Sequence, residues 1–275
     1  MNQTSDGTAG AFGDLKVRVI SGVGLGVVCL ALFWLGGWFS ASILAIGAAL
    51  MIWELREMTL GAGAGLAPGG IVAAGTGALA VLLTEGLELR FGLLIVLLVA
   101  VAQVLLSGQR GRIAALGLVY ITLGMMCIDG LRSDFAYGFT AVVWLVLVVI
   151  AADVGGYFFG RILGGPKLWP RVSPKKTWSG FLGGLFFAVS VGSVFSVLTP
   201  GTFALKVAVM SALIAAMSVA GDLLESTIKR HYGIKDASTL MPGHGGLLDR
   251  FDGLVAAAIV AGAISFVRGQ SIFIW

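Results

Sequence analysis

The chain has 275 residues, of which 58% are hydrophobic and only 12% are charged. Soluble domains carry about 25% charged residues, so this composition excludes an ordinary soluble enzyme and predicts an integral membrane protein. The net charge of +4 does not indicate a nucleic-acid partner, because basic residues in membrane proteins mainly orient the helices. The only two cysteines, Cys29 and Cys127, lie far apart and exclude a disulfide framework.

Nine apolar stretches predict an all-α, polytopic fold of about nine transmembrane helices. Several stretches are shorter than a full span and must be completed by flanking or partly polar residues. The first is too long for the apolar core of a secretion signal, so we expect it to be a retained helix. The stretches are 19–38, 40–53, 70–83, 91–106, 113–128, 139–152, 180–198, 207–220 and 254–267.

The basic residues predict the orientation of these helices. If the N-terminus is cytoplasmic, 14 of the 18 Lys and Arg residues fall in cytoplasmic segments and four in outer ones. This asymmetry is the one that the positive-inside rule predicts. We therefore expect a cytoplasmic tail at 1–18, N-terminal transmembrane helices over 19–138 and a catalytic transmembrane domain over 139–275. The last of these includes two cytoplasmic segments, 153–179 and 222–252.

Those two cytoplasmic segments hold 15 of the 32 charged residues. In the second, Asp222, Glu225, Ser226 and Lys229 are spaced so that a helix would place them on one face. Ionisable groups at membrane depth are costly and usually functional. The alternative is a solvated helix end with ordinary pairs between neighbouring turns.

The second segment ends in a glycine-rich loop whose residues suit a phosphate and metal site. These residues are Gly243, His244, Gly245, Gly246, Asp249, Arg250 and Asp252. Successive N–H groups in such a loop can bind an anion, and carboxylates suit Mg²⁺ together with substrate phosphates. Asp222 could add a third carboxylate, while Lys229 and Arg250 could neutralise phosphate. We expect His244 to donate to phosphate and not to bind metal, because Mg²⁺ prefers oxygen.

The first segment begins at Asp153, where the sequence predicts that a helix leaves the membrane. It ends in a compact cluster of hydrogen-bond donors suited to phosphate oxygens. The donors are Ser173, Lys175, Lys176 and Thr177. The alternative is a basic loop that only orients the protein.

Five sequence patterns together resemble the phosphatidate cytidylyltransferase family, also called CDP-diacylglycerol synthases. The patterns are Asp153-x-Gly155-x-Tyr157-x-x-Gly160-Arg161, Ser173-Pro174-x-Lys176-Thr177-Trp178, Ser226-x-x-Lys229-Arg230, Lys235-Asp236, and Pro242-x-His244-Gly245-Gly246-x-x-Asp249-Arg250-x-Asp252. They cover about a fifth of the chain. Two positions depart from the family pattern: Met241 replaces a branched or aromatic apolar residue, and Ser179 replaces a frequent Glu or Gln.

The resemblance implies a helical polytopic homodimer that uses Mg²⁺ and a second metal ion to react CTP with phosphatidate. It implies metal at the aspartates that match Asp222 and Asp249, with Lys229 beside them. The expected catalytic residues are Asp222, Lys229, His244, Asp249 and Arg250. The expected substrate-binding residues are Asp153, Ser173, Lys175, Lys176, Thr177, Ser226, Arg230, Gly245 and Gly246. The expected metal ligands are Asp222, Asp249 and Asp252.

Three other functions are compatible with parts of this pattern. A cation-coupled transporter would also carry membrane carboxylates such as Asp153 and Asp222, although no inverted repeat is visible. A CDP-alcohol phosphotransferase is disfavoured, because that family carries Asp-Gly-x-x-Ala-Arg, whereas Asp252-Gly253 is followed by Leu-Val-Ala-Ala without the arginine, and no later aspartate follows. A relative that acts on another lipid phosphate stays open. The short loops favour the inner membrane of a bacterium, with the site facing the cytoplasm.

Overall fold

In a computed structural model, residues 26–86, 89–199, 202–238, 240 and 245–274 are described. A short apolar helix at Gly26–Leu35 comes first. The longer helices are α2 (Trp38–Leu60), α3 (Pro68–Gly86), α4 (Leu89–Arg132), α5 (Gly138–Ile162), α6 (Trp178–Leu198), α7 (Ala204–His231) and α8 (Leu248–Arg268). Two short strands, β1 (Lys167–Trp169) and β2 (Ser173–Thr177), lie between α5 and α6.

Eight helical segments in the described part of the chain are long and apolar enough to cross a membrane. The count is eight because α4 contains two segments, Arg90–Gly108 and Gly111–Arg132, separated at Gly108, whose φ is 58°. The chain is therefore an all-α polytopic membrane protein, as predicted. The first predicted stretch, 19–38, corresponds to Gly26–Leu35, and its beginning lies outside the described residues.

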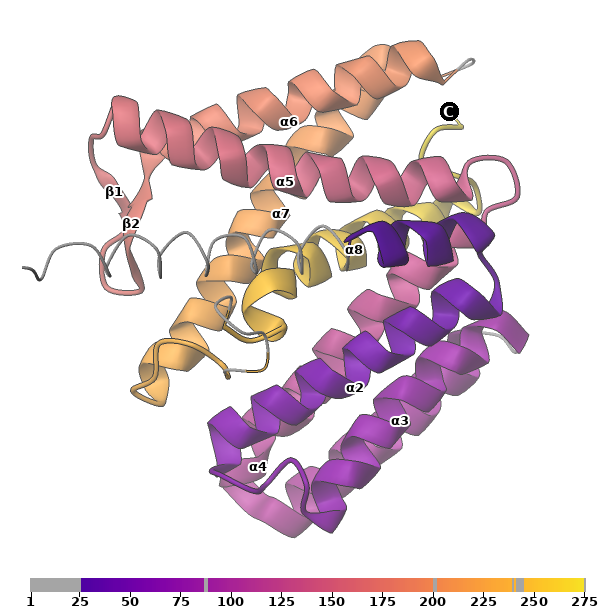
Figure 1. The fold of residues 1–275 in the computed structure, drawn as a ribbon, viewed down its shortest axis with the longest axis vertical. Coiled ribbons are helices and arrows are strands. Elements are labelled where there is room, and N and C mark those ends of the chain that lie inside the picture. Colours follow the sequence, from indigo (N-terminus) through magenta and orange to yellow (C-terminus); the bar gives the residue numbers. More distant parts are fainter. Residues whose placement is uncertain (1–25, 87–88, 200–201, 239, 241–244, 275) are drawn as a thin grey trace, which may run out of the picture.

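The helices form two groups that meet along α8 (Figure 1). In the first group α3 packs against both α2 and α4, and in the second α6 packs between α5 and α7. Helix α8 packs against α7 on one side and α4 on the other. A buried core joins the groups; within it the indole N–H of Trp144 donates to Ser211 Oγ at 3.0 Å. The predicted boundary at residue 138 falls at the start of α5.

The outer surface explains the apolar composition. Large apolar side chains such as Leu105, Leu106 and Val197 are more than three-quarters exposed. A soluble monomer rarely displays so much apolar surface, whereas lipid tails cover it at little cost. Burial of an apolar core is thus only part of the reason why the chain is so hydrophobic.

The segment between α5 and α6 differs from the loop that the sequence predicts. Strands β1 and β2 pair in antiparallel fashion, with Lys167 opposite Thr177 and Trp169 opposite Ser173. The N–H of Trp178 donates to the carbonyl of Pro166 at 3.1 Å and closes the hairpin where α6 begins. The hairpin therefore fixes the direction in which β2 presents its lysines.

The helix ends also differ from the prediction. Asp153 is not where α5 ends, because that helix continues for nine further residues to Ile162. Asp249 and Asp252 belong to the first turns of α8 and not to a loop. The first apolar residues of this segment, Leu247 and Leu248, come before both aspartates, so the helix begins ahead of them. The N–H groups of these two leucines have no partner within the helix and donate to acceptors elsewhere in the protein.

Candidate active site

The acidic residues predicted to carry the chemistry meet where α7 crosses the start of α8. Asp222 and Glu225 on α7 are the charged neighbours of Asp252 on α8. Two glycines make this approach possible. A Cβ on Gly221 would lie 2.4 Å from the carbonyl oxygen of Asp252, and one on Gly253 would lie 2.7 Å from Asp222 Oδ1. The two helices therefore need glycine at both positions to bring their carboxylates together.

Replacing Gly221 with alanine should force α7 and α8 apart, because the nearest atom is backbone. We expect Gly221→Ala to destabilise the protein by about 1–3 kcal/mol, the usual cost of overpacking. The matched control is Gly47→Ala, where nothing lies within 4 Å of the added methyl group. That variant should keep or raise stability, since alanine is the better helix former by about 1 kcal/mol. Thermal unfolding in one detergent compares the two, and equal melting temperatures would contradict the predicted packing.

Lysines from two elements face this acidic cluster. The Nζ atom of Lys176, on β2, forms an ion pair with Asp222 Oδ2. The Nζ atom of Lys229, on α7, donates to Glu225 Oε2 at 2.9 Å and to Asp249 Oδ1 at 2.7 Å. The side chain of Lys229 is 14% exposed and that of Asp222 is 21% exposed. The cluster is thus largely buried, and charges interact more strongly in the protein interior than in water. Asp222 is still accessible to solvent.

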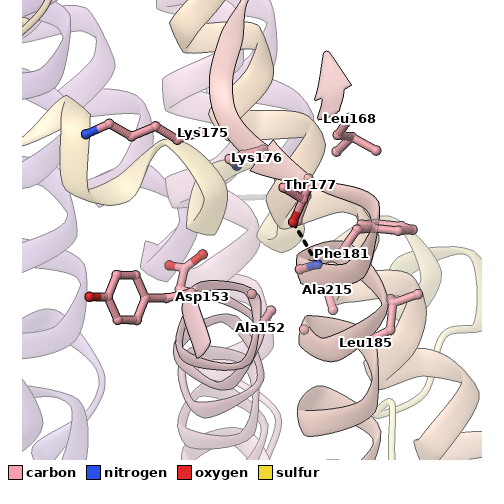
Figure 2. A pocket seen from close by; sticks show the side chains of 14 residues that line it. Ala152, Asp153, Leu168, Lys175, Lys176, Thr177, Phe181, Leu185 and Ala215 are labelled. Atoms are coloured by element: carbon pink, nitrogen blue, oxygen red, sulfur yellow. Dashed lines mark hydrogen bonds between the residues drawn. The ribbon is translucent and has the colours of Figure 1, made fainter. Parts of the chain in front are cut away.

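A pocket of about 190 Å³ lies next to the cluster, between α5, α6 and α7, and β2 covers one end. Figure 2 shows the Asp153 carboxylate pointing toward the end where β2 carries Lys175 and Lys176. The remaining wall is apolar. It comes mainly from Ala152, Phe181, Leu185, Ala215 and Val219. The pocket therefore offers charge at one end and a hydrocarbon-like surface at the other.

Thr177 and Ser173, both predicted to bind phosphate, lie in different places relative to the pocket. Thr177 lines it, but its Oγ1 accepts from the N–H of Gly180 at 3.0 Å and so caps α6. Its hydroxyl therefore stabilises the helix start. Ser173 pairs with Trp169 at the far end of the hairpin and does not line the pocket.

Asp249 is held by hydrogen bonds that the sequence did not reveal. Its Oδ1 accepts from Lys229, and its Oδ2 accepts from the N–H groups of Ala237 and Gly246, both at 2.9 Å. A carboxylate has about four acceptor positions, and a longer contact of 3.2 Å from Ala237 to Oδ1 occupies another. The N–H of Gly246, predicted to bind phosphate, therefore binds Asp249 here.

The carboxylates of the cluster have the donor chemistry of the magnesium site that the resemblance implies. Within the described ranges, no group of three or more Asp, Glu, His or Cys side chains is arranged as a metal site. The donor chemistry nevertheless fits, because Asp222 and Asp252 supply adjacent hard oxygens and Mg²⁺ commonly takes one or two carboxylates plus phosphates. Glu225 Oε1 is also buried without a hydrogen-bond partner among those residues. A carboxylate oxygen in that position calls for a cation or a proton.

The other predicted site residues lie outside the pocket lining or outside the described residues. Ser226 and Arg230 lie in the last turns of α7, and neither lines the pocket. Arg250 is exposed on the first turn of α8, and Gly245 precedes it with a φ of 83°. His244 lies outside the described residues. Two residues absent from the predicted site belong near it. Glu225 could have been found from its helical spacing, whereas no sequence pattern indicates Glu54.

Comparison with known proteins shows which family the chain belongs to. A model of the cytidylyltransferase family matches residues 16–267, which is most of the chain. The chain belongs to the cytidylyltransferase family. It is therefore an enzyme, and the family match spans both helix groups and every element that contributes to the acidic cluster.

Individual relatives in the family agree with this assignment. A phosphatidate cytidylyltransferase from Brucella suis is 41% identical over 259 residues, which cover 89% of this chain and 91% of the relative. One from Staphylococcus saprophyticus is 41% identical over 138 residues, and one from Bacillus subtilis is 37% identical over 141 residues. Each of these two matches covers 50% of this chain, with 52% and 51% of the respective relative.

Proposed function

We propose that this enzyme transfers the cytidylyl group of CTP to phosphatidate, giving CDP-diacylglycerol and pyrophosphate in phospholipid biosynthesis. The observation that carries the proposal is the pocket that joins a charged end at Asp153, Lys175 and Lys176 to an apolar wall. A lipid phosphate has the same two-part character. The relatives named phosphatidate cytidylyltransferase support the choice of substrate.

In the proposed reaction a phosphate oxygen of phosphatidate attacks the α-phosphorus of CTP. The bond from that phosphorus to the bridging oxygen of the β-phosphate breaks, and pyrophosphate leaves with the bonding electrons. Both reactants are anions, so the protein must hold them together against repulsion. Positioning and charge neutralisation account for most of the catalysis in such transfers.

Lys176 and Lys175 would hold one phosphate-bearing substrate at the charged end of the pocket. Lys176 is the better placed of the two, because its ion pair with Asp222 brings it to the acidic cluster. Lys229 and Arg250 would stabilise charge on the departing pyrophosphate. His244 stays a predicted phosphate donor, together with Ser226, Arg230, Gly245 and the hydroxyl of Ser173.

We infer that Asp222 and Asp252 would hold Mg²⁺, with Asp249 as the third predicted ligand. The hydrogen bonds to Asp249 mean that it would first have to release one of its donors, such as Lys229. When bound, the ion would reduce the negative charge of the CTP phosphates. A second metal ion stays a prediction from the family resemblance.

The apolar wall would take the lipid part of phosphatidate. Phe181 and Leu185 on α6 line it, and neighbouring α6 residues such as Phe186 are exposed where lipid would cover them. An acyl chain could thus stay within the bilayer while its phosphate reaches Lys176. Bacterial relatives and the positive-inside pattern support an inner-membrane protein with a cytoplasmic site. The homodimer implied by the resemblance remains a prediction.

Removing the ammonium of Lys176 should weaken the reaction far more than removing a charge elsewhere on the hairpin. We expect Lys176→Ala to lower kcat/KM about 10- to 100-fold, the cost of one charge-assisted hydrogen bond. Lys167→Ala, on β1 and outside the pocket lining, should change kcat/KM by less than about twofold. Initial rates with varied CTP and varied phosphatidate measure both. Equal losses in the two variants would remove Lys176 from the proposed site.

The proposed substrates can be tested with matched lipid acceptors. Purified protein in vesicles is given CTP and Mg²⁺ with either phosphatidate or diacylglycerol of the same acyl chains. We expect CDP-diacylglycerol and pyrophosphate in equal amounts from phosphatidate and no product from diacylglycerol. Product from another lipid phosphate but not from phosphatidate would move the function to that lipid. No product from any lipid phosphate, together with cation flux into the vesicles, would favour the transporter.

A further inference from the structure

Glu54 lies on α2, in the helix group that supplies none of the carboxylates Asp222, Glu225, Asp249 and Asp252, yet it contacts the start of α8. Its side chain is fully buried. Oε1 accepts from the N–H of Leu247 at 2.9 Å, and Oε2 accepts from the N–H of Leu248 at 2.7 Å. Ser238 Oγ also donates to Oε1. A carboxylate is therefore placed against the positive end of α8, where it is stabilised by the helix dipole and by two free N–H groups.

The contacts of Glu54 and Asp249 are complementary. Asp249 binds the N–H groups of Ala237 and Gly246, while Glu54 binds the adjacent residues Ser238 and Leu247. Together the two carboxylates hold residues 237–238 beside residues 246–247, within the connection from α7 to α8. Gly246 lies between the two carboxylates, and a Cβ there would be 3.0 Å from Glu54 Oε1 and 3.1 Å from Asp249 Oδ2. Glycine at this position is thus explained by the close approach of two carboxylates.

We propose that Glu54 is a positioning residue of the active site. It fixes where α8 begins and how it is turned, and so it places Asp249 and Asp252 opposite Asp222 on α7. Glu54 is too buried to touch a substrate, so it acts only through α8. This inference rests on the proposed function for its kinetic consequence, but its structural consequence can be measured without any substrate.

A second glutamate on the same helix provides a matched control. Glu57 also accepts two backbone N–H groups, from Gly63 at 2.7 Å and from Gly65 at 2.9 Å. These belong to the connection between α2 and α3 and not to the start of α8. Glu54→Gln and Glu57→Gln therefore make the same chemical change, one helical turn apart, to carboxylates with the same kind of partners.

The expected kinetic result separates positioning from stability. Glu54→Gln should lower kcat about 10- to 100-fold, because small displacements of reacting groups are costly, and should change KM for CTP much less. Glu57→Gln should retain the wild-type kcat within about twofold. Glu54→Asp, which keeps the charge on a shorter side chain, should recover part of the lost kcat. Equal effects of the two glutamine variants would overturn the proposal.

Hydrogen–deuterium exchange of the substrate-free protein provides the second readout. The peptide containing Leu247 and Leu248 should exchange at least about tenfold faster in Glu54→Gln than in wild type. In Glu57→Gln its exchange rate should equal that of wild type. Unchanged exchange in Glu54→Gln would also overturn the proposal. If wild-type protein makes no product from phosphatidate but the exchange result holds, the proposed function fails while the positioning role of Glu54 stands.

Discussion

Asp222→Asn should reduce the rate of cytidylyl transfer about 10³-fold, the upper end of the loss when one electrostatic contact to a phosphoryl transition state is removed. Asp222 is the member of the acidic cluster that interacts with both β2 and α8. It ion-pairs with Lys176 on β2, and it lies beside Asp252 on α8. An amide in its place keeps the size of the side chain but neither attracts a cation nor orients Lys176.

The control for this substitution is Asp134→Asn. Asp134 Oδ1 accepts from the N–H of Ala136 at 3.2 Å and of Tyr137 at 2.6 Å, just before α5. Asparagine retains that acceptor, and the position precedes α5, whereas Asp153 lies in the second half of that helix. We expect wild-type rates within about twofold. Initial rates and melting temperatures of both variants check the result. An active Asp222→Asn variant would exclude this residue as a metal ligand.

Lys229→Met should impair both stability and catalysis. Lys229 is the only cation in the described part of the chain seen to bridge Glu225 and Asp249. Its removal leaves two largely buried carboxylates without their counter-charge, which costs about 3–5 kcal/mol. We expect a lower melting temperature and a loss of activity of at least about 10²-fold.

A double variant separates these two effects of Lys229. Without Lys229, the carboxylates of Glu225 and Asp249 repel each other. Combining Lys229→Met with Glu225→Gln removes one of these two charges, so part of the lost stability should return. Activity should not return, because the ammonium near the proposed pyrophosphate position is still missing. Melting temperature and rate measured on one preparation check both statements. Recovery of activity together with stability would mean that Lys229 is only structural.

Much of the architecture could be predicted from sequence, because lipid imposes long apolar helices whose lengths are visible in one dimension. The stripe from Asp222 to Lys229 was also predictable, since the helical repeat alone puts these residues on one face. The structure brings Lys176 to Asp222 across 46 residues of sequence. No spacing rule could show that pair, although both residues were in the predicted site.

The remaining features depended on contacts between distant segments. Asp249 was predicted to bind metal from a loop, but it lies on α8 and accepts the N–H groups of Ala237 and Gly246. Glu54 directly follows the predicted apolar stretch 40–53, and nothing in the sequence indicates its contacts. Only the packing of α2 against the start of α8 shows that it accepts the first N–H groups of α8. The β1–β2 hairpin was missed because its strands have only three and five residues.

The most direct test of the central claim follows the phosphorus atoms of CTP. Wild-type protein in phosphatidate vesicles with Mg²⁺ is given CTP labelled at either the α- or the γ-phosphorus, beside Asp222→Asn. The account predicts that α-label enters the lipid with wild type only and that γ-label appears only in pyrophosphate. Transfer of γ-label to lipid, or equal transfer of α-label by both proteins, would contradict it.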